Sequence, residues 1–208
     1  MRMIYLFILF TPLLLASCAA SINQRNAIFY HEAGLQASAD GNYALAEINF
    51  SRVLVNARLG NSPTAGISMA TYNFGRAKAN LCKIEEAENL LTEALNLEEE
   101  NSGPKSVETT MRLFELARVK TAQKMPSDAV TFYDRAISNV RELNIEASDP
   151  VGFSLVLDDY AAELSKIGSS EKSAESIAEA TRLREMNAGR VAGLRPDDYS
   201  LACSNNGT

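Results

Sequence analysis

The sequence predicts an all-α protein, built as a solenoid of about four helix-turn-helix repeats. Three observations favour this fold class. One phrase of small and large apolar residues returns along the chain, over residues 41–54, 82–95 and 124–137 and, more faintly, over 169–183. A proline stands near the start of each later repeat, and no stretch has the alternation and β-branched content of a strand. A fixed period of this size indicates one helical unit stacked on itself.

The N-terminal segment has a different character from the rest of the chain. Arg2 is followed by the almost wholly apolar run 3–15, and small residues then lead to Cys18. This is the signal-peptide pattern. The run is too short for a transmembrane helix, which needs about 20 apolar residues. The sequence therefore predicts a signal peptide over residues 1–17.

Residues 15–18, Leu-Ala-Ser-Cys, resemble the lipobox of bacterial lipoproteins. The resemblance implies cleavage before Cys18 and a covalent lipid on that residue, with 18–26 as a lipidated N-terminus and short tether. Because Ala19 rather than aspartate follows the cysteine, it also implies an outer-membrane lipoprotein that faces the periplasm. The alternative is an ordinary secretory signal with a chance cysteine.

The rest of the chain is expected to form helices in pairs. The turn 40–42 contains a glycine suited to a left-handed helix stop, and the helix after it carries a stripe of apolar residues at helical spacing. Pro63, Pro104 and Pro150 stand before the first helices of the later pairs, each after a residue type that caps helix N-termini. The expected helices are 23–39 and 43–58, 66–81 and 84–98, 106–123 and 126–143, and 151–167 and 171–187.

Small and large residues recur at fixed positions of these pairs, and the pairs resemble tetratricopeptide repeats. The resemblance implies a right-handed superhelical solenoid over residues 27–188. The positions that carry the resemblance are Tyr30, Ala33, Gly34, Ala46, Phe50 and Val53 in the first copy; Phe74, Gly75, Ala87, Leu91 and Ala94 in the second; Leu113, Leu116, Ala117, Ala129, Tyr133 and Ala136 in the third; and Ala161, Ala162, Ala174, Ala178 and Thr181 in the fourth.

The repeats are longer than the ordinary unit of about 34 residues. The alanines at 46, 87, 129 and 174 are 41, 42 and 45 residues apart. This spacing is similar to the long-helix variant of kinesin light chains, whereas HEAT and armadillo repeats are the alternative. The repeats are expected at about 27–58, 66–99, 106–143 and 151–187, with 189–208 as a C-terminal cap or disordered tail.

Solenoids of this family present a concave groove lined by the first helices of the pairs. Arg76 and Arg118 occupy the same register in neighbouring copies, and an arginine binds a carboxylate with two parallel hydrogen bonds. The alternative is that both are solvated residues paired with glutamates such as Glu115. The candidate partner-binding residues are Tyr72, Asn73, Arg76, Asn80 and Arg118.

The sequence favours a non-catalytic interaction protein: a scaffold or assembly factor that binds another envelope protein or a peptide segment. A secreted or periplasmic regulatory or cell-wall adaptor is the alternative, and an enzyme using Asp158 and Asp159 is the least favoured. The net charge of −6 gives no indication of nucleic-acid binding. We expect no cofactor other than the lipid, no metal and no small-molecule substrate.

Several remaining residues carry expectations of their own. His31 is the only histidine, so it is expected to be a polar surface residue, and the acidic run 98–100 is expected to be a solvated helix end. Cys82 and Cys203 are far apart in sequence and are expected to be unpaired thiols. In the tail, we expect 204–208 to be disordered and the apolar residues to cover the exposed end of the stack; those residues are Val191, Leu194, Tyr199 and Leu201.

Overall fold

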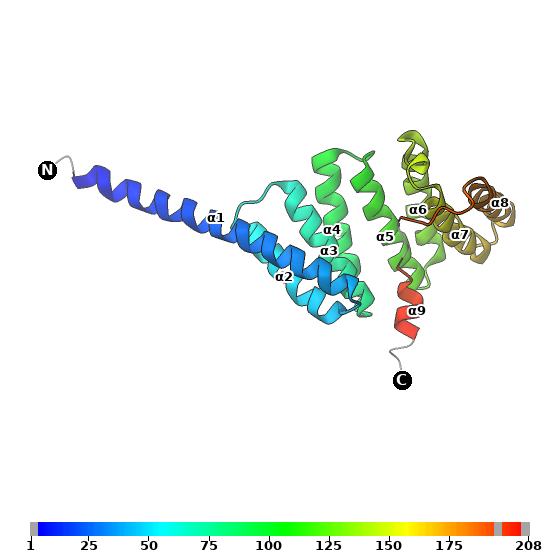
Figure 1. Ribbon diagram of the computed structural model, residues 1–208, viewed down its shortest axis with the longest axis horizontal. Helices are drawn as coiled ribbons and strands as arrows, with labels where there is room; N and C mark the ends of the chain where they lie inside the picture. Colours follow the sequence, from blue (N-terminus) through cyan, green and yellow to red (C-terminus); the bar gives the residue numbers. More distant parts are fainter. Residues whose placement is uncertain (1–3, 194–196, 205–208) are drawn as a thin grey trace.

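The computed structural model describes the backbone of residues 4–193 and 197–204, and this part of the chain is helical, without a strand (Figure 1). The predicted all-α solenoid is confirmed. Its elements are α1 (Ile4–Ala39), α2 (Tyr43–Leu59), α3 (Thr64–Asn80), α4 (Ile84–Ser102), α5 (Val107–Ala122), α6 (Pro126–Glu142), the 3₁₀ turn η1 (Ile145–Ala147), α7 (Pro150–Lys166), α8 (Ser170–Met186) and α9 (Tyr199–Ser204).

The helices stack in the order of the sequence, and each of α1 to α7 packs against the next (Figure 1). Two helices are longer than the sequence pattern indicates. α1 runs without a break through residues 18–26, which were expected to form a tether, and α4 continues to Ser102. Within the described part of the chain, none of the helices has the combined length and apolar character that crossing a bilayer requires. Cleavage before Cys18 stays a prediction.

The turn inside each pair contains a residue in the left-handed region. These residues are Gly41, Cys82, Lys124 and Gly168, with φ between 59° and 79°. Glycine adopts this conformation without a steric cost, whereas other residues adopt it only when the surroundings fix the turn. The same turn geometry in all four helix pairs shows that each pair is the same structural unit, although Cys82 and Lys124 stand where the other two turns have glycine.

The prolines mark the helix starts only in part. Asp149 caps α7, because its Oδ1 accepts a hydrogen bond from the Gly152 backbone N–H at 2.9 Å. The predicted caps at Ser62 and Gly103 are wrong. Pro63 itself precedes α3, and Ser106 caps α5 by accepting from the Thr109 N–H at 3.0 Å. A short link therefore separates Pro104 from its helix.

Close packing inside the pairs follows the predicted positions in the first three copies. A Cβ on Gly34 would lie 2.6 Å from the Phe50 ring, and one on Gly75 would lie 2.8 Å from Leu91 Cγ. Real Cβ contacts are not this short, so both glycines are required for the helices to approach. The small residues Ala46, Ala87 and Ala129 are completely buried at the equivalent positions of the second helices.

The predicted register of the fourth copy is wrong by one residue. Ala174 and Ala178 are exposed, whereas Ser173 is buried and donates a hydrogen bond to the Ala161 carbonyl at 2.8 Å. Ser173 therefore occupies the position of Ala129 in the preceding copy. The alanine-rich sequence of α8 offers a small residue in either register, which explains why the pattern alone selected the wrong one.

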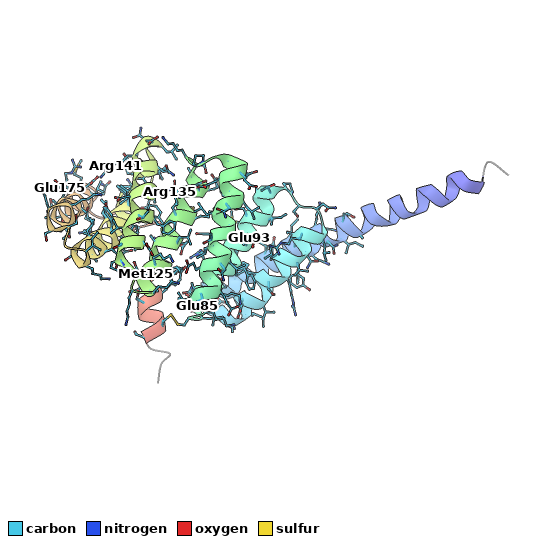
Figure 2. All side chains as sticks on the ribbon, turned by 180° about the vertical axis from the view of Figure 1, so that it is seen from behind. Glu85, Glu93, Met125, Arg135, Arg141 and Glu175 are labelled. Atoms are coloured by element: carbon cyan, nitrogen blue, oxygen red, sulfur yellow. A yellow bond between two sulfur atoms is a disulfide. The ribbon has the colours of Figure 1, made fainter. Side chains whose placement is uncertain are left out.

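The second helices form a continuous outer face that is connected by ion pairs between neighbouring repeats (Figure 2). Each pair is partly exposed, and such pairs contribute about 0–1 kcal/mol. They are Arg58–Glu93 at 2.6 Å, Arg135–Glu99 at 2.5 Å, Lys172–Asp134 at 2.7 Å and Arg141–Glu179 at 2.9 Å.

Candidate functional site

Glu115, on α5, is the buried acid around which the predicted groove residues gather. It is 4% exposed. Arg118 donates a hydrogen bond to its Oε1 at 2.9 Å, and Nε of Arg76, on α3, lies 3.4 Å from the same oxygen. The Tyr72 hydroxyl donates to it from 3.5 Å. Arg76 and Arg118, which have matching register, therefore share the carboxylate of Glu115. This pairing with a glutamate is the alternative that the sequence offered, but Glu115 is buried and not solvated.

The charges of this site are fixed by their mutual proximity. Burial is the largest single effect on Arg76 and Arg118 and lowers their pKa. The surrounding acidic groups, with Glu115 first among them, together outweigh burial and raise the pKa of both, so both guanidiniums stay charged. Burial, reinforced by Glu115, raises the pKa of Tyr72, so its hydroxyl remains a donor. We refer to Tyr72, Arg76, Glu115 and Arg118 as the Glu115 site.

A segment from the far end of the chain also lies at this site. Helix α9 packs against α5 and α3 (Figure 1). Asp197 accepts a hydrogen bond from Arg76 Nη2 at 2.5 Å. Tyr199 is 1% exposed, and its hydroxyl donates to Oε2 of Glu115 at 2.5 Å. The first-helix face is therefore already occupied by residues 197–204.

A disulfide holds this segment in place. Cys203 is bonded to Cys82, in the turn between α3 and α4, with a Cα–Cα distance of 5.2 Å (Figure 2). The expectation of two unpaired thiols is wrong. The two cysteines are 121 residues apart, and only the return of the chain over the first helices brings them together. A pairing of this kind leaves no local signal in the sequence.

The tail does not form the expected cap over the end of the stack. Tyr199 is buried against α3 and α5, in the middle of the solenoid, and Val191 is 78% exposed. Leu194 and residues 205–208 lie outside the described residues, as does the side chain of Leu201. The sequence indicated that apolar tail residues cover something, but not that the covered surface is the Glu115 site.

The five predicted groove residues line two cavities that have Arg76 in common. Tyr72, Arg76 and Arg118 line a cavity of about 120 Å³ whose other walls are largely apolar, including Met111 and Phe153. Asn73 and Asn80 line a second cavity of about 90 Å³, together with Arg76 and Asp197. Asn73 is buried, and Asn80 donates a hydrogen bond to the Arg76 carbonyl at 3.1 Å.

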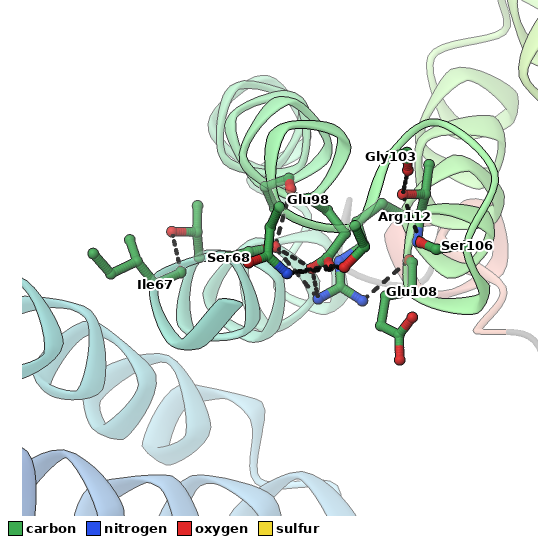
Figure 3. Close-up of polar contacts among 12 residues, drawn as sticks. Ile67, Ser68, Glu98, Gly103, Ser106, Glu108 and Arg112 are labelled. Carbon is green, nitrogen blue, oxygen red and sulfur yellow. Dashed lines mark hydrogen bonds and ion pairs between the residues drawn. The ribbon is translucent and has the colours of Figure 1, made fainter. Parts of the chain in front are cut away.

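A second buried charge cluster lies between α3, α4 and α5 (Figure 3). Arg112, 1% exposed, lies 3.1 Å from Oε2 of Glu98, which also accepts a hydrogen bond from Ser68 at 2.8 Å. The Arg112 guanidinium is stacked over the Tyr72 ring, 4.6 Å from its centroid. The expected solvated end at Glu98 is therefore wrong. Because α4 continues to Ser102, Glu98 lies inside the helix and contacts the next repeat. The sequence reasoning did not identify Arg112.

Other titratable groups occupy separate positions. Asp158 is paired with Arg184 at 2.5 Å. The pKa of Asp159 is raised to about 6, first by burial and then by the nearby carboxylates of Asp198, Asp158 and Glu163, against an opposing effect of Arg118. His31 is half-buried, with its ring 6.2 Å from that of Phe50. Among the described residues, no group of three or more histidine, cysteine, aspartate or glutamate side chains is placed to hold a metal ion.

The central repeats match a known repeat family. Residues 66–142 match the family model described as "Tetratricopeptide repeat". These central repeats are tetratricopeptide repeats. The same paired architecture continues in α1–α2 and in α7–α8, on both sides of the matched segment. No curated protein matches the sequence of this chain significantly.

Solved structures share the fold over most of this chain. BtubC (BKLC) from P. vanneervenii is 18% identical, with a TM-score of 0.72 over 82% of this chain and 68% of that chain. The protein described as "Podosopora anserina putative kinesin light chain nearly identical TPR-like repeats" is 14% identical to this chain, with a TM-score of 0.60 over 77% of this chain and 76% of that chain. Aspartyl phosphate phosphatase F from Bacillus subtilis is 15% identical, with a TM-score of 0.69 over 80% and 42%. At these identities the likeness concerns the fold alone.

Proposed function

We propose that this chain is a non-catalytic, lipid-anchored tetratricopeptide-repeat protein that binds another envelope protein through its first-helix face, as a scaffold or assembly factor. One observation carries the proposal. The Glu115 site receives a short peptide segment through an ion pair and a buried tyrosine, in this case the chain's own residues 197–204. A face that accommodates one short segment has the features needed for another.

The electrostatics of the site support binding rather than catalysis. Glu115 is neutralised by two guanidiniums and accepts hydrogen bonds from two phenols. A carboxylate held in this way is poorly placed as a general base, because both of its oxygens already face donors of the protein rather than a substrate proton. The site therefore has the chemistry of recognition, with fixed charges and donors that orient a bound chain.

The disulfide supports the proposed location in the envelope. Disulfides persist in oxidising compartments such as the bacterial periplasm and are rare in the cytosol. Together with the lipobox at residues 15–18, the Cys82–Cys203 bond is consistent with export before folding. On this proposal, a lipid on Cys18 attaches α1 to the outer membrane, and the repeats face the periplasm.

Site-specific crosslinking in living cells tests the binding face. A photoreactive residue at Met111, which lines the cavity beside the Glu115 site, is expected to capture one envelope protein. The same residue at Arg135, on the outer face of α6 (Figure 2), is the matched control and should not capture it. Equal capture at both positions would contradict the proposal. Charge reversal of Arg76 and Arg118 is unsuitable, because it would leave Glu115 buried among like charges.

Metabolic labelling tests the anchor. Radiolabelled palmitate is expected to label the full-length chain and its Cys203→Ser variant, but not the Cys18→Ala variant. The Cys18→Ala protein should leave the membrane fraction, because acyl chains supply about 0.8 kcal/mol of binding per buried CH₂. A Cys18→Ala protein that remains in the membrane fraction would overturn the lipid-anchor part of the proposal and leave the binding face untouched.

A further inference from the structure

The segment 197–204 is bound like a short peptide ligand rather than packed like another repeat. α9 has six residues, which is far too few for a helix that is stable without tertiary contacts. The contacts described above that hold it are the Asp197–Arg76 ion pair, the buried Tyr199 side chain and the disulfide. The segment 197–204 is therefore ordered by its contacts with the surface on which it lies.

The receiving surface is complete without the segment. If residues 197–204 leave, Glu115 keeps both arginines and the Tyr72 hydroxyl as partners. The Arg76 side chain is 36% exposed even with Asp197 in place, so solvent reaches it readily. Loss of the segment removes the Asp197 carboxylate from Arg76, the hydrogen bond of Tyr199 from Glu115, and the buried Tyr199 ring. The site is thus preorganised for a segment that supplies a carboxylate, a hydrogen-bond donor and an aromatic ring.

We propose that the Glu115 site binds a segment of a partner protein in which a carboxylate residue stands two positions before a tyrosine, and that residues 197–204 are an internal competitor for the same site. This inference rests on the proposed function, because it names the chemistry of the partner that the face binds. The pattern comes from the occupant in place, where Asp197 meets Arg76 and Tyr199 meets Glu115.

The structure accounts for both elements of the pattern. Arg76 provides a charge-assisted hydrogen bond that an amide cannot match, so asparagine is a poor substitute for the carboxylate residue. Oε2 of Glu115 accepts from the Tyr199 hydroxyl. Phenylalanine would bury this oxygen without that donor, and an unsatisfied buried charge is costly. The site therefore selects tyrosine over phenylalanine, although both rings have the same apolar area.

The surroundings leave space for a partner segment longer than the internal one. A cavity of about 120 Å³ adjoins the Glu115 site, and another of about 430 Å³ lies between the docked segment and α7. The disulfide, in turn, keeps the internal segment at a high effective concentration, so an external segment competes poorly while the bond is closed. Removing the bond should therefore expose the binding activity.

Peptide binding to the full-length chain tests the proposal. The probe is a fluorescent peptide with the sequence of residues 195–202, Arg-Pro-Asp-Asp-Tyr-Ser-Leu-Ala. The receptor carries Cys82→Ser, Cys203→Ser and Tyr199→Ala, which together release the internal segment. By fluorescence anisotropy, this receptor should bind the probe at least tenfold more tightly than the disulfide-bonded chain. Probes with asparagine in place of Asp197, or phenylalanine in place of Tyr199, should each bind at least tenfold more weakly.

A double-mutant cycle locates the contact. Arg76→Gln in the receptor should weaken the parent probe at least tenfold and should have almost no further effect on the asparagine probe. Arg135→Gln, on the outer face, is the matched control and should leave all affinities unchanged. A probe that binds equally well to the Arg76→Gln and Arg135→Gln receptors would overturn the proposal.

Hydrogen exchange covers the case in which the triple variant is poorly folded. In a chain with only Cys82→Ser and Cys203→Ser, excess probe should accelerate amide exchange in residues 199–204 and leave α6 unchanged; an unchanged rate at millimolar probe would overturn the proposal. If the probe fails but Met111 still crosslinks an envelope protein, the proposed function stands without this partner chemistry. If the probe binds but Met111 captures nothing, the proposed function fails and the peptide specificity stands.

Discussion

Replacement of Gly75 by alanine tests the packing of the central repeats directly. Gly75 is buried in α3, where it faces Leu90 and Leu91 of α4. An added Cβ would lie 2.8 Å from Leu91 Cγ, 3.1 Å from Leu91 Cδ2 and 3.3 Å from Leu90 Cβ. One of the nearest atoms belongs to the root of a side chain, so the contact cannot be relieved by rotating a flexible end. The two helices must separate or Leu91, which is completely buried, must leave its rotamer.

The magnitude follows from two opposing effects. Overpacking of a filled core costs about 1–3 kcal/mol, whereas alanine in place of glycine stabilises a helix interior by roughly 0.5–1 kcal/mol. Because the 2.8 Å contact is not with a flexible end, the upper half of the overpacking range applies, and the expected net loss is about 1–2.5 kcal/mol. For a domain of this size, that corresponds to a fall in Tm of roughly 2–10 °C. Leucine at position 75 adds three further carbons to the same space and should cost more than alanine.

Gly66→Ala is the matched control, because both glycines lie in α3. The Cβ at position 66 would have only one near neighbour, Ser62 Cβ at 3.6 Å, which is an ordinary contact. This variant should be unchanged or more stable by up to about 1 kcal/mol. Thermal unfolding followed by circular dichroism measures both. A Gly75→Ala protein as stable as the Gly66→Ala protein would refute the close approach of α3 and α4 at this position.

Two other substitutions test the buried charges. Glu98→Gln leaves the Arg112 guanidinium buried without its carboxylate, and we expect the free energy of unfolding, measured in urea, to fall by about 3–5 kcal/mol. Glu99→Gln, in the adjacent and partly exposed ion pair with Arg135, is the control and should lower it by about 0–1 kcal/mol. Equal losses in the two variants would contradict the buried Arg112–Glu98 pair. Because the pKa of Asp159 is raised to about 6, its stabilising contribution is complete below the ordinary carboxyl pKa and is lost as the pH rises through about 6. Asp159→Asn should therefore be more stable than the parent chain at pH 8, by up to about 3 kcal/mol, and its stability should not fall as the pH rises through about 6. If stability depends on pH identically in both proteins, the raised pKa of Asp159 is contradicted.

The repeated architecture was predictable because it is encoded locally. A small residue is required wherever two helices approach closely, and Gly34, Gly75 and Ala87 fulfil this requirement at fixed spacing. Helix starts and turns repeat with the same period. The prediction was wrong where the local signal is degenerate: α8 offers Ser173 and Ala174 as adjacent small residues, and only packing against α7 selects Ser173.

The candidate site was predictable only in part, because its completion depends on contacts distant in sequence. The shared register of Arg76 and Arg118 correctly indicated a common location on the first-helix face. What the arginines contact there depends on Glu115 and on residues 197–204, which return from the far end of the chain. Burial of Glu98 had a similar cause, since it depends on a helix that continues beyond its apolar pattern.

The charge balance of the Glu115 site connects the fold to the proposed binding. Arg118 faces Glu115 and the nearby carboxylate of Asp159, whereas Arg76 shares Glu115 and also meets Asp197 of the docked segment. Without the segment, Arg76 keeps only its share of Glu115. Because Arg76 is partly shielded from water, its field is stronger than that of an exposed lysine. A neutral segment would leave Arg76 without its second carboxylate. The contact that holds the internal segment in place therefore favours partners that supply a carboxylate at the position of Asp197.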